Sequence, residues 1–260
     1  MTEPFLSIVR RLHSVSMFRR WARRIAVGWT VTQRFHGGVI RLDAVEHSWA
    51  WTGSRRLENF ERDLQDRLDA LMRDRDCLVD IGSNIGVMTL SVLLRNPQAR
   101  AVAIDANLRA IELLSQSLRR NGLAGRAQTF AVAVSSGASE LTFEPGGSFT
   151  GHVATAGTTV PAVPLPELLR RHASNRAVVK IDIEGYEALL ADSFRQLPPA
   201  PGSVLAIELH PRGFNGLGDP ERVVMALQSR GDLRLQLIGG PDLGSLDPTQ
   251  FNQLEAQWAP

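Results

Sequence analysis

The stretch CLVDIGSNIGVMTLSVLLR (residues 77–95) decides the fold. It begins with a short apolar run that ends at glycine, which is typical of a buried strand. The residues after Gly86, VMTLSVLLR, predict a helix. Gly82 and Gly86 allow the chain between strand and helix to turn tightly and to approach a ligand closely. A buried strand, a glycine turn and a helix in this order form the first unit of an α/β sheet.

The same alternation continues toward the C-terminus. Further strands are expected at residues 101–105, 127–135, 177–185, 203–210, 233–239 and 253–260, and helices at residues 107–123 and 219–231. SELTFE and TTVPAV predict an added hairpin. Strands that alternate with helices at this spacing predict a Rossmann-like, doubly wound α/β fold, with a mostly parallel seven-stranded sheet and helices on both faces.

The N-terminal part of the chain lacks this rhythm. We therefore expect a helical or irregular N-terminal cap over residues 1–60, with residues 57–72 forming a helix into the first strand, and one α/β domain over residues 61–260. In the first 25 residues, apolar side chains recur at helical spacing and arginines occupy the other faces. We interpret this segment as a helix that caps the domain. A basic helix lying on an anionic membrane surface is the alternative.

Composition excludes several classes of protein. The 260 residues are 43% hydrophobic and 22% charged, with a formal net charge of +2, as in an ordinary soluble globular protein. No stretch approaches the ~18 apolar residues of a membrane span, and the N-terminus lacks the apolar core of a signal peptide. The single cysteine, Cys77, excludes an internal disulfide and fits a reducing compartment. We expect a cytoplasmic protein, with any membrane contact peripheral, and predict no oligomeric state.

Polar side chains gather where the expected strands end. Ligands of such sheets bind outside the carboxyl ends of the strands, so these side chains should share one edge. The polar set comprises Asp80, Asn84, Asp105, Asp182, Glu184, Glu208 and His210, and Gly82 and Gly86 lie in the same turn as Asn84. Each acid taken singly is explained as a helix cap or a surface charge. So many at one edge predict a polar cleft, because buried charges are costly elsewhere.

The ligand expected in this cleft is a nucleoside. Asp105, at the end of the second strand, can accept hydrogen bonds from both hydroxyls of a ribose. The first turn departs from the G-x-G-x-x-G pattern of dinucleotide sites, which argues against an NAD-dependent oxidoreductase. Asp80 would repel a pyrophosphate, whereas it suits a cofactor with a positively charged amino-acid end.

On these residues the sequence resembles the class I S-adenosylmethionine-dependent methyltransferases, and within them the FkbM family. The motifs are LVDIGSNIGVMTL, KIDIEGYE and IELH, spread over roughly residues 60–240. The resemblance implies S-adenosylmethionine as cofactor and O-methylation of a sugar, glycolipid, polyketide or related metabolite. It places the cofactor at Asp80, Gly82, Ser83, Asn84, Gly86, Asp105, Ala106 and Ala133. The sequence departs from the family at Asp105–Ala106, where Glu–Pro is usual, and in the loop AVSSGA, which lacks an acid after the serine.

The only lysine in the chain, Lys180, lies in the second of these motifs. In an extended strand the side chains of residues 180, 182 and 184 share one face. A buried ammonium needs a partner, so we expect Lys180 to pair with Asp182 or Asp80. We predict a structural role for it, since a compact ammonium fits a narrow slot that a guanidinium would not.

Methyl transfer to a hydroxyl requires alignment and a base. We predict His210 as the base, because an ordinary imidazole pKa lies near 7, and Asp182 as its orienting partner. Glu184 and Glu208 are expected to contact the acceptor. A metal held by Asp182, Glu184 and His210 is conceivable by ligand type, but the sequence shows no clear ligand cluster, and we predict none.

The expected acceptor is a small molecule, a glycan or a glycolipid. Trp49 and Trp51 suit stacking on a sugar ring, although packing beneath the N-terminal cap explains them equally. An RNA 2′-O-methyltransferase is one alternative, and it lacks a basic surface interleaved with aromatic residues. A nucleotide-binding Rossmann protein without methyltransferase activity is another, and the acids at the strand ends argue against it. We expect no DNA partner.

Overall fold

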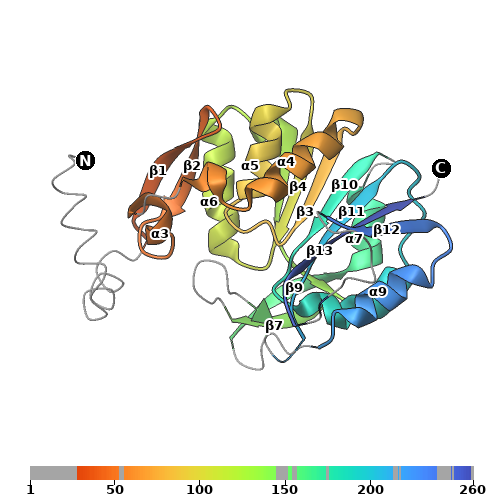
Figure 1. The fold of residues 1–260 in the computed structure, drawn as a ribbon. Coiled ribbons are helices and arrows are strands. Elements are labelled where there is room, and N and C mark those ends of the chain that lie inside the picture. The colour runs from red at the N-terminus through yellow and green to blue at the C-terminus, as the bar shows by residue number, and fades with distance from the viewer. Residues whose placement is uncertain are drawn as a thin grey trace.

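A seven-stranded sheet forms the centre of the molecule, with the order β12-β13-β11-β10-β3-β4-β5 (Figure 1). The computed structural model describes residues 28–52, 56–144, 152–153, 157–173, 176–212, 216, 218–238, 247 and 249–258. The strands are β3 (Cys77–Ile81), β4 (Arg100–Asp105), β5 (Ala127–Ala131), β10 (Ala177–Ile181), β11 (Val204–Leu209), β12 (Leu233–Leu237) and β13 (Asn252–Trp258). β13 runs antiparallel to both of its neighbours, and the remaining neighbours pair in parallel. The predicted mostly parallel seven-stranded sheet is therefore confirmed.

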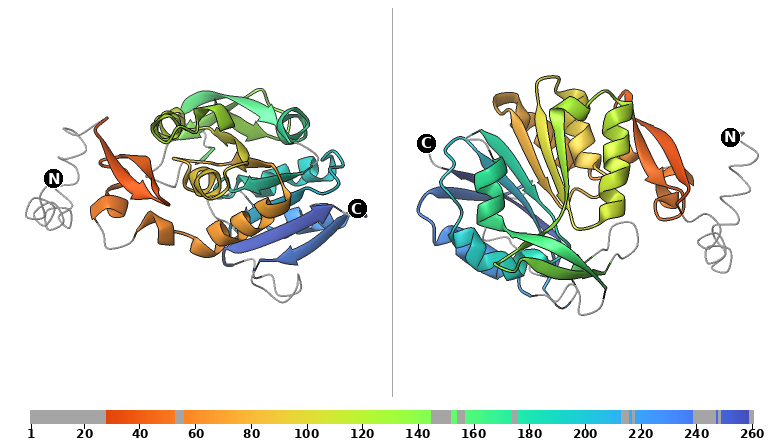
Figure 2. Two further views of the ribbon diagram at one scale, coloured as in Figure 1. Left: turned by 90° about the horizontal axis from the view of Figure 1, so that it is seen from above. Right: turned by 180° about the vertical axis from the view of Figure 1, so that it is seen from behind.

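Helices cover both faces of this sheet (Figure 2). One face packs against α4 (Arg62–Leu71), α5 (Val87–Arg95) and α6 (Leu108–Arg120), and the other against α7 (Leu165–His172), α8 (Ala191–Arg195) and α9 (Glu221–Gln228). Successive residues of a strand point to opposite faces, so Leu78 and Val178 join the first core while Val79 and Val179 join the second. Parallel strands buried on both faces are mostly apolar, and the buried Asp80 of β3 and Lys180 of β10 are exceptions in these strands.

The predicted helix boundaries around the first two strands are confirmed. α5 begins directly after Gly86 and ends at Arg95. The side chain of Asn107 caps α6 by accepting hydrogen bonds from the backbone N–H groups of Arg109 and Ala110. Gly122 follows the end of α6 with a φ of 70°. No helix in the described part of the chain is long and apolar enough to cross a membrane.

The N-terminal part contains a β-hairpin, so the expectation of a helical or irregular cap is wrong for residues 30–43. β1 (Thr30–Phe35) and β2 (Gly38–Asp43) pair antiparallel. His36 and Gly37 connect them with φ angles of 45° and 81°, as in the two-residue turn whose twist suits a hairpin. The signal was the dipeptide HG between two segments of alternating polarity. The basic segment of residues 1–27 lies outside the described residues.

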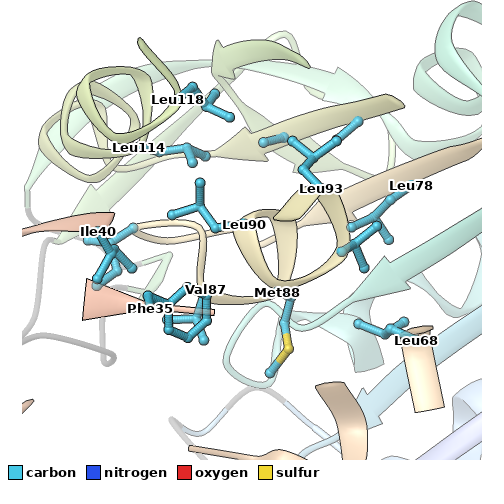
Figure 3. Close-up of a cluster of buried hydrophobic side chains, with 14 of the residues drawn as sticks. Phe35, Ile40, Leu68, Leu78, Val87, Met88, Leu90, Leu93, Leu114 and Leu118 are labelled. Carbon is cyan, nitrogen blue, oxygen red and sulfur yellow. The ribbon is translucent and has the colours of Figure 1, made fainter. Parts of the chain in front are cut away.

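The hairpin is fixed to the α/β domain by both polar and apolar contacts. The side-chain amide of Asn121 donates to the Val39 carbonyl at 2.6 Å and accepts from the Val39 N–H at 2.8 Å. Phe35 and Ile40 lie beside Val87 of α5 in the same buried cluster (Figure 3). The hairpin is therefore part of the packed structure.

Residues 57–72 form a broken helix where we expected a continuous one. A 3-10 turn, η1 (Leu57–Asn59), precedes α4, and the 3-10 turn η2 (Met72–Asp74) follows it. Glu61, between η1 and α4, has a left-handed backbone conformation with a φ of 46°. This residue interrupts the helix and changes the direction of the chain.

The expected strand at residues 127–135 is also divided. β5 stays in the central sheet, while β6 (Ala133–Ser135) leaves it and pairs in parallel with β9 (Thr158–Pro164). β7 (Glu140–Glu144) pairs antiparallel with β9 and with β8 (His152–Val153), which confirms the predicted hairpin. The remaining short elements are the helix α3 (Ser48–Thr52) and the 3-10 turns η3 (Ala124–Arg126) and η4 (Tyr186–Leu190).

Candidate functional site

A cavity of about 380 Å³ opens at the carboxyl ends of β3, β4, β10 and β11. Its volume lies within the range of small-molecule sites. The predicted site residues that line it are Gly82, Ser83, Asn84, Asp105, Ala106, Ala133, Asp182, Glu184, Glu208 and His210. The structure thus brings together ten of the fourteen residues singled out in the sequence.

Asp105 anchors one end of the cavity. Its carboxylate accepts the backbone N–H of Asn84 at 2.7 Å and that of Asn107 at 2.7 Å, one on each oxygen. Burial raises the pKa of Asp105 to about 6, against the effect of these two hydrogen bonds. Each oxygen keeps a second acceptor position. The carboxylate can therefore accept two further hydroxyl donors, as a ribose would supply.

Apolar residues flank Asp105. Ile104, Ala133, Val134 and Phe143 line the same cavity. They give this part of the cavity an uncharged lining.

The glycine turn after β3 leaves no room for a side chain. Gly82 has a φ of 76°, and a Cβ at this position would lie 1.6 Å from the carbonyl oxygen of Asp182. The ammonium of Lys180 donates to the Gly82 carbonyl at 3.1 Å. The turn is thus pressed against β10 and held there by the only lysine of the chain.

Lys180 also forms two ion pairs. Its Nζ lies 3.1 Å from Asp182 Oδ2 and 3.5 Å from Asp80 Oδ1. Burial opposes its charge, but Asp182 and Asp80 raise the pKa of Lys180 above its ordinary value. The predicted pairing is confirmed, and in fact both carboxylates take part. Its structural role stays a prediction.

Two predicted cofactor residues do not line the cavity. Asp80 is fully buried beneath it and accepts a hydrogen bond from the Thr89 hydroxyl at 2.6 Å. Gly86 lies at the start of α5, where a Cβ would approach Leu114 to 2.2 Å. Both residues are enclosed by neighbouring side chains. They therefore support the cavity and do not line it.

His210 lies among carboxylates. Its Nε2 is 3.5 Å from Glu184 Oε2 and 3.7 Å from Asp182 Oδ1, and its Nδ1 is 3.3 Å from Glu187 Oε2. Burial opposes the charged ring, but the nearby carboxylates of Glu184, Glu187 and Asp182 outweigh it and raise the pKa of His210 to about 10. The ring therefore holds its proton at neutral pH. The expectation of a neutral imidazole, on which the role of base rested, is wrong for this arrangement.

Glu187 is a residue that the sequence interpretation missed, although it ends the motif KIDIEGYE. It is buried, and its Oε1 accepts the N–H of Ile183 at 2.6 Å. Its other oxygen faces His210. Glu187 could have been found in the sequence, because it is an acid next to apolar residues in a motif whose other acids were already assigned.

Strained backbone gathers around the cavity. Within the described ranges, four residues other than glycine have a positive φ: His36, Glu61, Asn84 and Glu184. The last three line the cavity. Glu184 was expected to continue the alternation of β10, but that strand ends at Ile181 and Glu184 follows in a left-handed turn with a φ of 56°. Such conformations cost energy and concentrate at functional sites.

The N-terminal part contributes Phe60 and Glu61 to the cavity wall, and the sequence interpretation assigned neither. Trp49 does not line the cavity. Its ring packs on Phe60 with centroids 5.6 Å apart, so it supports the wall from outside. The side chain of Trp51 lies outside the described residues.

Three residues have ligand atoms close enough for a metal ion. Asp182, Glu208 and His210 each place one such atom within 4.8 Å of the others. The set differs from the one considered in the sequence, since Glu208 replaces Glu184. His210 is already flanked by carboxylates, and a shared cluster of this kind does not require an ion. The absence of a metal stays a prediction.

Part of the chain is similar to a family of methyltransferases. The family model "methyltransferase small domain" matches residues 62–144, from α4 to β7. No curated protein matches the chain. Similar solved structures include the O-methyltransferase TomG from Streptomyces achromogenes in complex with SAM, at 13% identity and a TM-score of 0.47, covering 85% of this chain and 92% of that one.

Two other similar solved structures concern RNA. A putative rRNA-methylase from Clostridium thermocellum has 12% identity and a TM-score of 0.49, with 76% of this chain and 95% of that chain covered. The complex of aTrm5 and tRNALeu gives 12% identity and a TM-score of 0.49, covering 88% of this chain. This chain spans about half, 53%, of that protein. Identities this low transfer no substrate.

Proposed function

We propose that the chain is an S-adenosylmethionine-dependent methyltransferase that methylates a hydroxyl of a sugar, glycolipid, polyketide or related metabolite. The observation that carries the proposal is the division of the cavity. One end offers the free acceptor positions of Asp105 beside an apolar slot, and the other end is rich in carboxylates. The resemblance of the sequence motifs to the FkbM family supports the same assignment.

The residues present fit the cofactor. Asp105 suits the ribose, and Ala106, Ala133 and Phe143 border the slot for the adenine. S-adenosylmethionine, when bound, supplies the methyl group on a positively charged sulfur and carries an ammonium besides. Asp182, at the end of β10, faces the same cavity and favours these positive charges.

The charge of the cavity bears on the acceptor. Glu61, Asp182, Glu184 and Glu208 face it, against the cations Lys180 and His210. The excess of negative charge repels phosphates, so an RNA acceptor is disfavoured. Carboxylates accept hydrogen bonds from neutral hydroxyls. A polyhydroxylated neutral acceptor is favoured.

Roles for the remaining predicted residues follow from their places. We assign Asp182 to orienting the acceptor hydroxyl or the ammonium of the cofactor, and Glu184 and Glu208 to acceptor contacts. His210 acts as a fixed positive charge that holds Asp182 and Glu184 in position. Phe60 replaces Trp49 as the aromatic surface toward an acceptor ring. A glycolipid acceptor and peripheral membrane contact through residues 1–25 belong to the same proposal.

Two measurements test this function. Calorimetry should detect binding of S-adenosylmethionine and of S-adenosylhomocysteine, and failure to bind either would overturn the cofactor. S-adenosylmethionine labelled in its methyl group is then incubated with fractionated glycans, lipids, small metabolites and RNA from a bacterial extract. We expect label in a neutral fraction, on oxygen. Label in RNA alone would overturn the proposed acceptor class.

A further inference from the structure

Among the residues that the structure describes, one carboxylate in the cavity has no hydrogen-bond or ion-pair partner. Five acids line it, and four are engaged: Asp105 by two backbone N–H groups, Asp182 by Lys180, Glu184 by His210, and Glu208 by the Gln253 amide at 3.3 Å. The carboxylate of the fifth, Glu61, makes no hydrogen bond or ion pair with any residue that the structure describes. It therefore faces the cavity as a free acceptor.

The backbone around Glu61 is held firmly. The buried side-chain amide of Gln65 donates to the carbonyls of Phe60 at 2.6 Å and of Leu57 at 3.2 Å. Its oxygen lies 2.7 Å from Nε2 of His36, in the turn of the β1–β2 hairpin. The N–H of His36 in turn donates to Glu58 at 3.0 Å. The hairpin turn thus fixes the segment that places Glu61 at the cavity.

The conformation of Glu61 is unfavourable for a residue with a side chain. Its φ of 46° lies in the left-handed region, which glycine and asparagine occupy far more readily than glutamate. Glu61 lies between η1 and α4, and its left-handed backbone conformation directs it to the cavity. A strained backbone at a residue that lines a cavity is typical of functional sites, and this supports a use for the Glu61 carboxylate.

The surroundings of Glu61 make its carboxylate a usable base. Burial, followed by Glu208 and Asp182, raises the pKa of Glu61 to about 7, with Glu184 adding to the shift and Lys180 opposing it. His210 lines the same cavity. A base is most effective when its pKa lies near the working pH. A carboxylate in an ion pair, such as Asp182, is less suitable as the base, because protonating it would break that ion pair.

We propose that Glu61 is the general base that receives the proton of the acceptor hydroxyl, an inference that rests on the proposed function. The acceptor oxygen forms a bond to the methyl carbon while the carbon–sulfur bond breaks, and its electron pair stays on sulfur to give S-adenosylhomocysteine. The hydroxyl proton passes to the Glu61 carboxylate and is later lost to water. Glu61 is thus a catalytic residue contributed by the N-terminal part of the chain.

The competing role for Glu61 is to hold the ammonium of the cofactor, and one variant separates the two. Glu61→Gln keeps the shape and removes the base. We expect calorimetry to give an S-adenosylhomocysteine affinity within about twofold of wild type, because a base for the acceptor does not touch the cofactor. A tenfold or greater loss of this affinity would overturn the proposal.

The second readout is methyl transfer in a single turnover, with labelled S-adenosylmethionine and the extract fraction that accepts label. Glu61→Gln should lower the rate about 10²–10⁴-fold, in the range for removal of a general base. Asp63→Asn is the matched control, since Asp63 is an exposed acid two residues further along, in the first turn of α4. It should transfer at the wild-type rate. A Glu61→Gln rate within threefold of wild type would overturn the proposal.

The pH profile distinguishes a base from a structural residue. The wild-type rate should rise as Glu61 ionises around pH 7, Glu61→Asp should keep that rise at a lower rate, and Glu61→Gln should lack it. A rise that persists in Glu61→Gln would exclude Glu61. Thermal melting of each variant checks folding, and Glu61→Asp preserves the test if Glu61→Gln is unstable. Absence of cofactor binding by the wild type would refute the proposed function instead.

Discussion

The two ends of the cavity are built in different ways. At the end that we propose for the nucleoside, called the nucleoside end below, Asp105 is held by the backbone N–H groups of Asn84 and Asn107, which lie in the continuous segment from β3 to the start of α6. At the acidic end, side chains from β10, β11 and the N-terminal part meet, and ion pairs among them hold the arrangement. The carboxylate at the first end is held by groups at most 21 residues away in the chain. The second depends on the whole chain being folded.

This difference has an energetic consequence. When a carboxylate that accepts backbone N–H groups is removed, those N–H groups can bind water or other acceptors. The loss in the free energy of unfolding is then modest. A buried ion pair broken on one side leaves an uncompensated charge, which costs far more. We therefore expect substitutions at the acidic end to affect stability most, and substitutions at the nucleoside end to affect cofactor affinity.

The largest effect is expected from Lys180→Met. Lys180 is 5% exposed and faces the fully buried Asp80, so the substitution leaves that carboxylate unpaired. The free energy of unfolding should fall by roughly 3–5 kcal/mol. Denaturant titration measures it. Adding Asp80→Asn should recover part of the loss, because the unpaired charge is then removed. A single variant of wild-type stability without turnover would make Lys180 catalytic.

The next effect is a pH dependence of stability. The folded pKa of His210, about 10, lies above its ordinary value of about 6.5, so its contribution is complete below pH 6.5 and is lost as the pH rises toward 10. One pKa unit corresponds to about 1.4 kcal/mol, so a few kcal/mol are at stake. The free energy of unfolding should fall steeply between pH 7 and 10 for wild type and less steeply for His210→Gln. An equal pH dependence of stability in the two proteins would contradict a charged imidazole at His210.

Much of the nucleoside end could be predicted from the sequence. The strand at residues 77–81, the start of α5 and the Asn107 cap follow from local patterns, because each depends on neighbours in the chain. The pairing of Lys180 was predictable as well, since a lone buried ammonium requires a carboxylate on an adjacent strand.

The acidic end was only half predictable. Strand-end acids identified Asp182 and Glu208, but Glu61 is 121 residues from Asp182 in sequence and reaches the cavity through a left-handed turn that no local pattern signals. The pKa of His210 depends on Glu184 and Glu187 meeting it in space. Side-chain periodicity of a strand also failed at Glu184, because the strand ends before it.

A smaller effect is expected at the nucleoside end. Asp105→Ala removes the hydrogen bonds proposed to the ribose, and bonds to a charged group contribute about 1.5–3 kcal/mol. Affinity for S-adenosylhomocysteine should therefore fall about 10–150-fold. Calorimetry measures it, and Glu112→Gln, an exposed acid on α6, serves as the control. Unchanged affinity in Asp105→Ala would refute the placement of the ribose.

The smallest effect tests the strain at Glu61 and has the opposite sign. A left-handed conformation costs a residue with a Cβ roughly 1–2 kcal/mol, and glycine avoids this cost while losing roughly 0.5–1 kcal/mol through its greater unfolded freedom. Glu61→Gly should therefore stabilise the fold by up to about 1 kcal/mol, a rise in melting temperature of roughly 2–4 °C. Asp63→Gly, within regular helix, should destabilise it by about as much. Glu61→Gln separates charge from strain, because it removes the carboxylate but keeps the left-handed side chain. If Glu61→Gly is no more stable than Glu61→Gln, the backbone at this position carries no strain, and the retention of a glutamate there loses its significance for function.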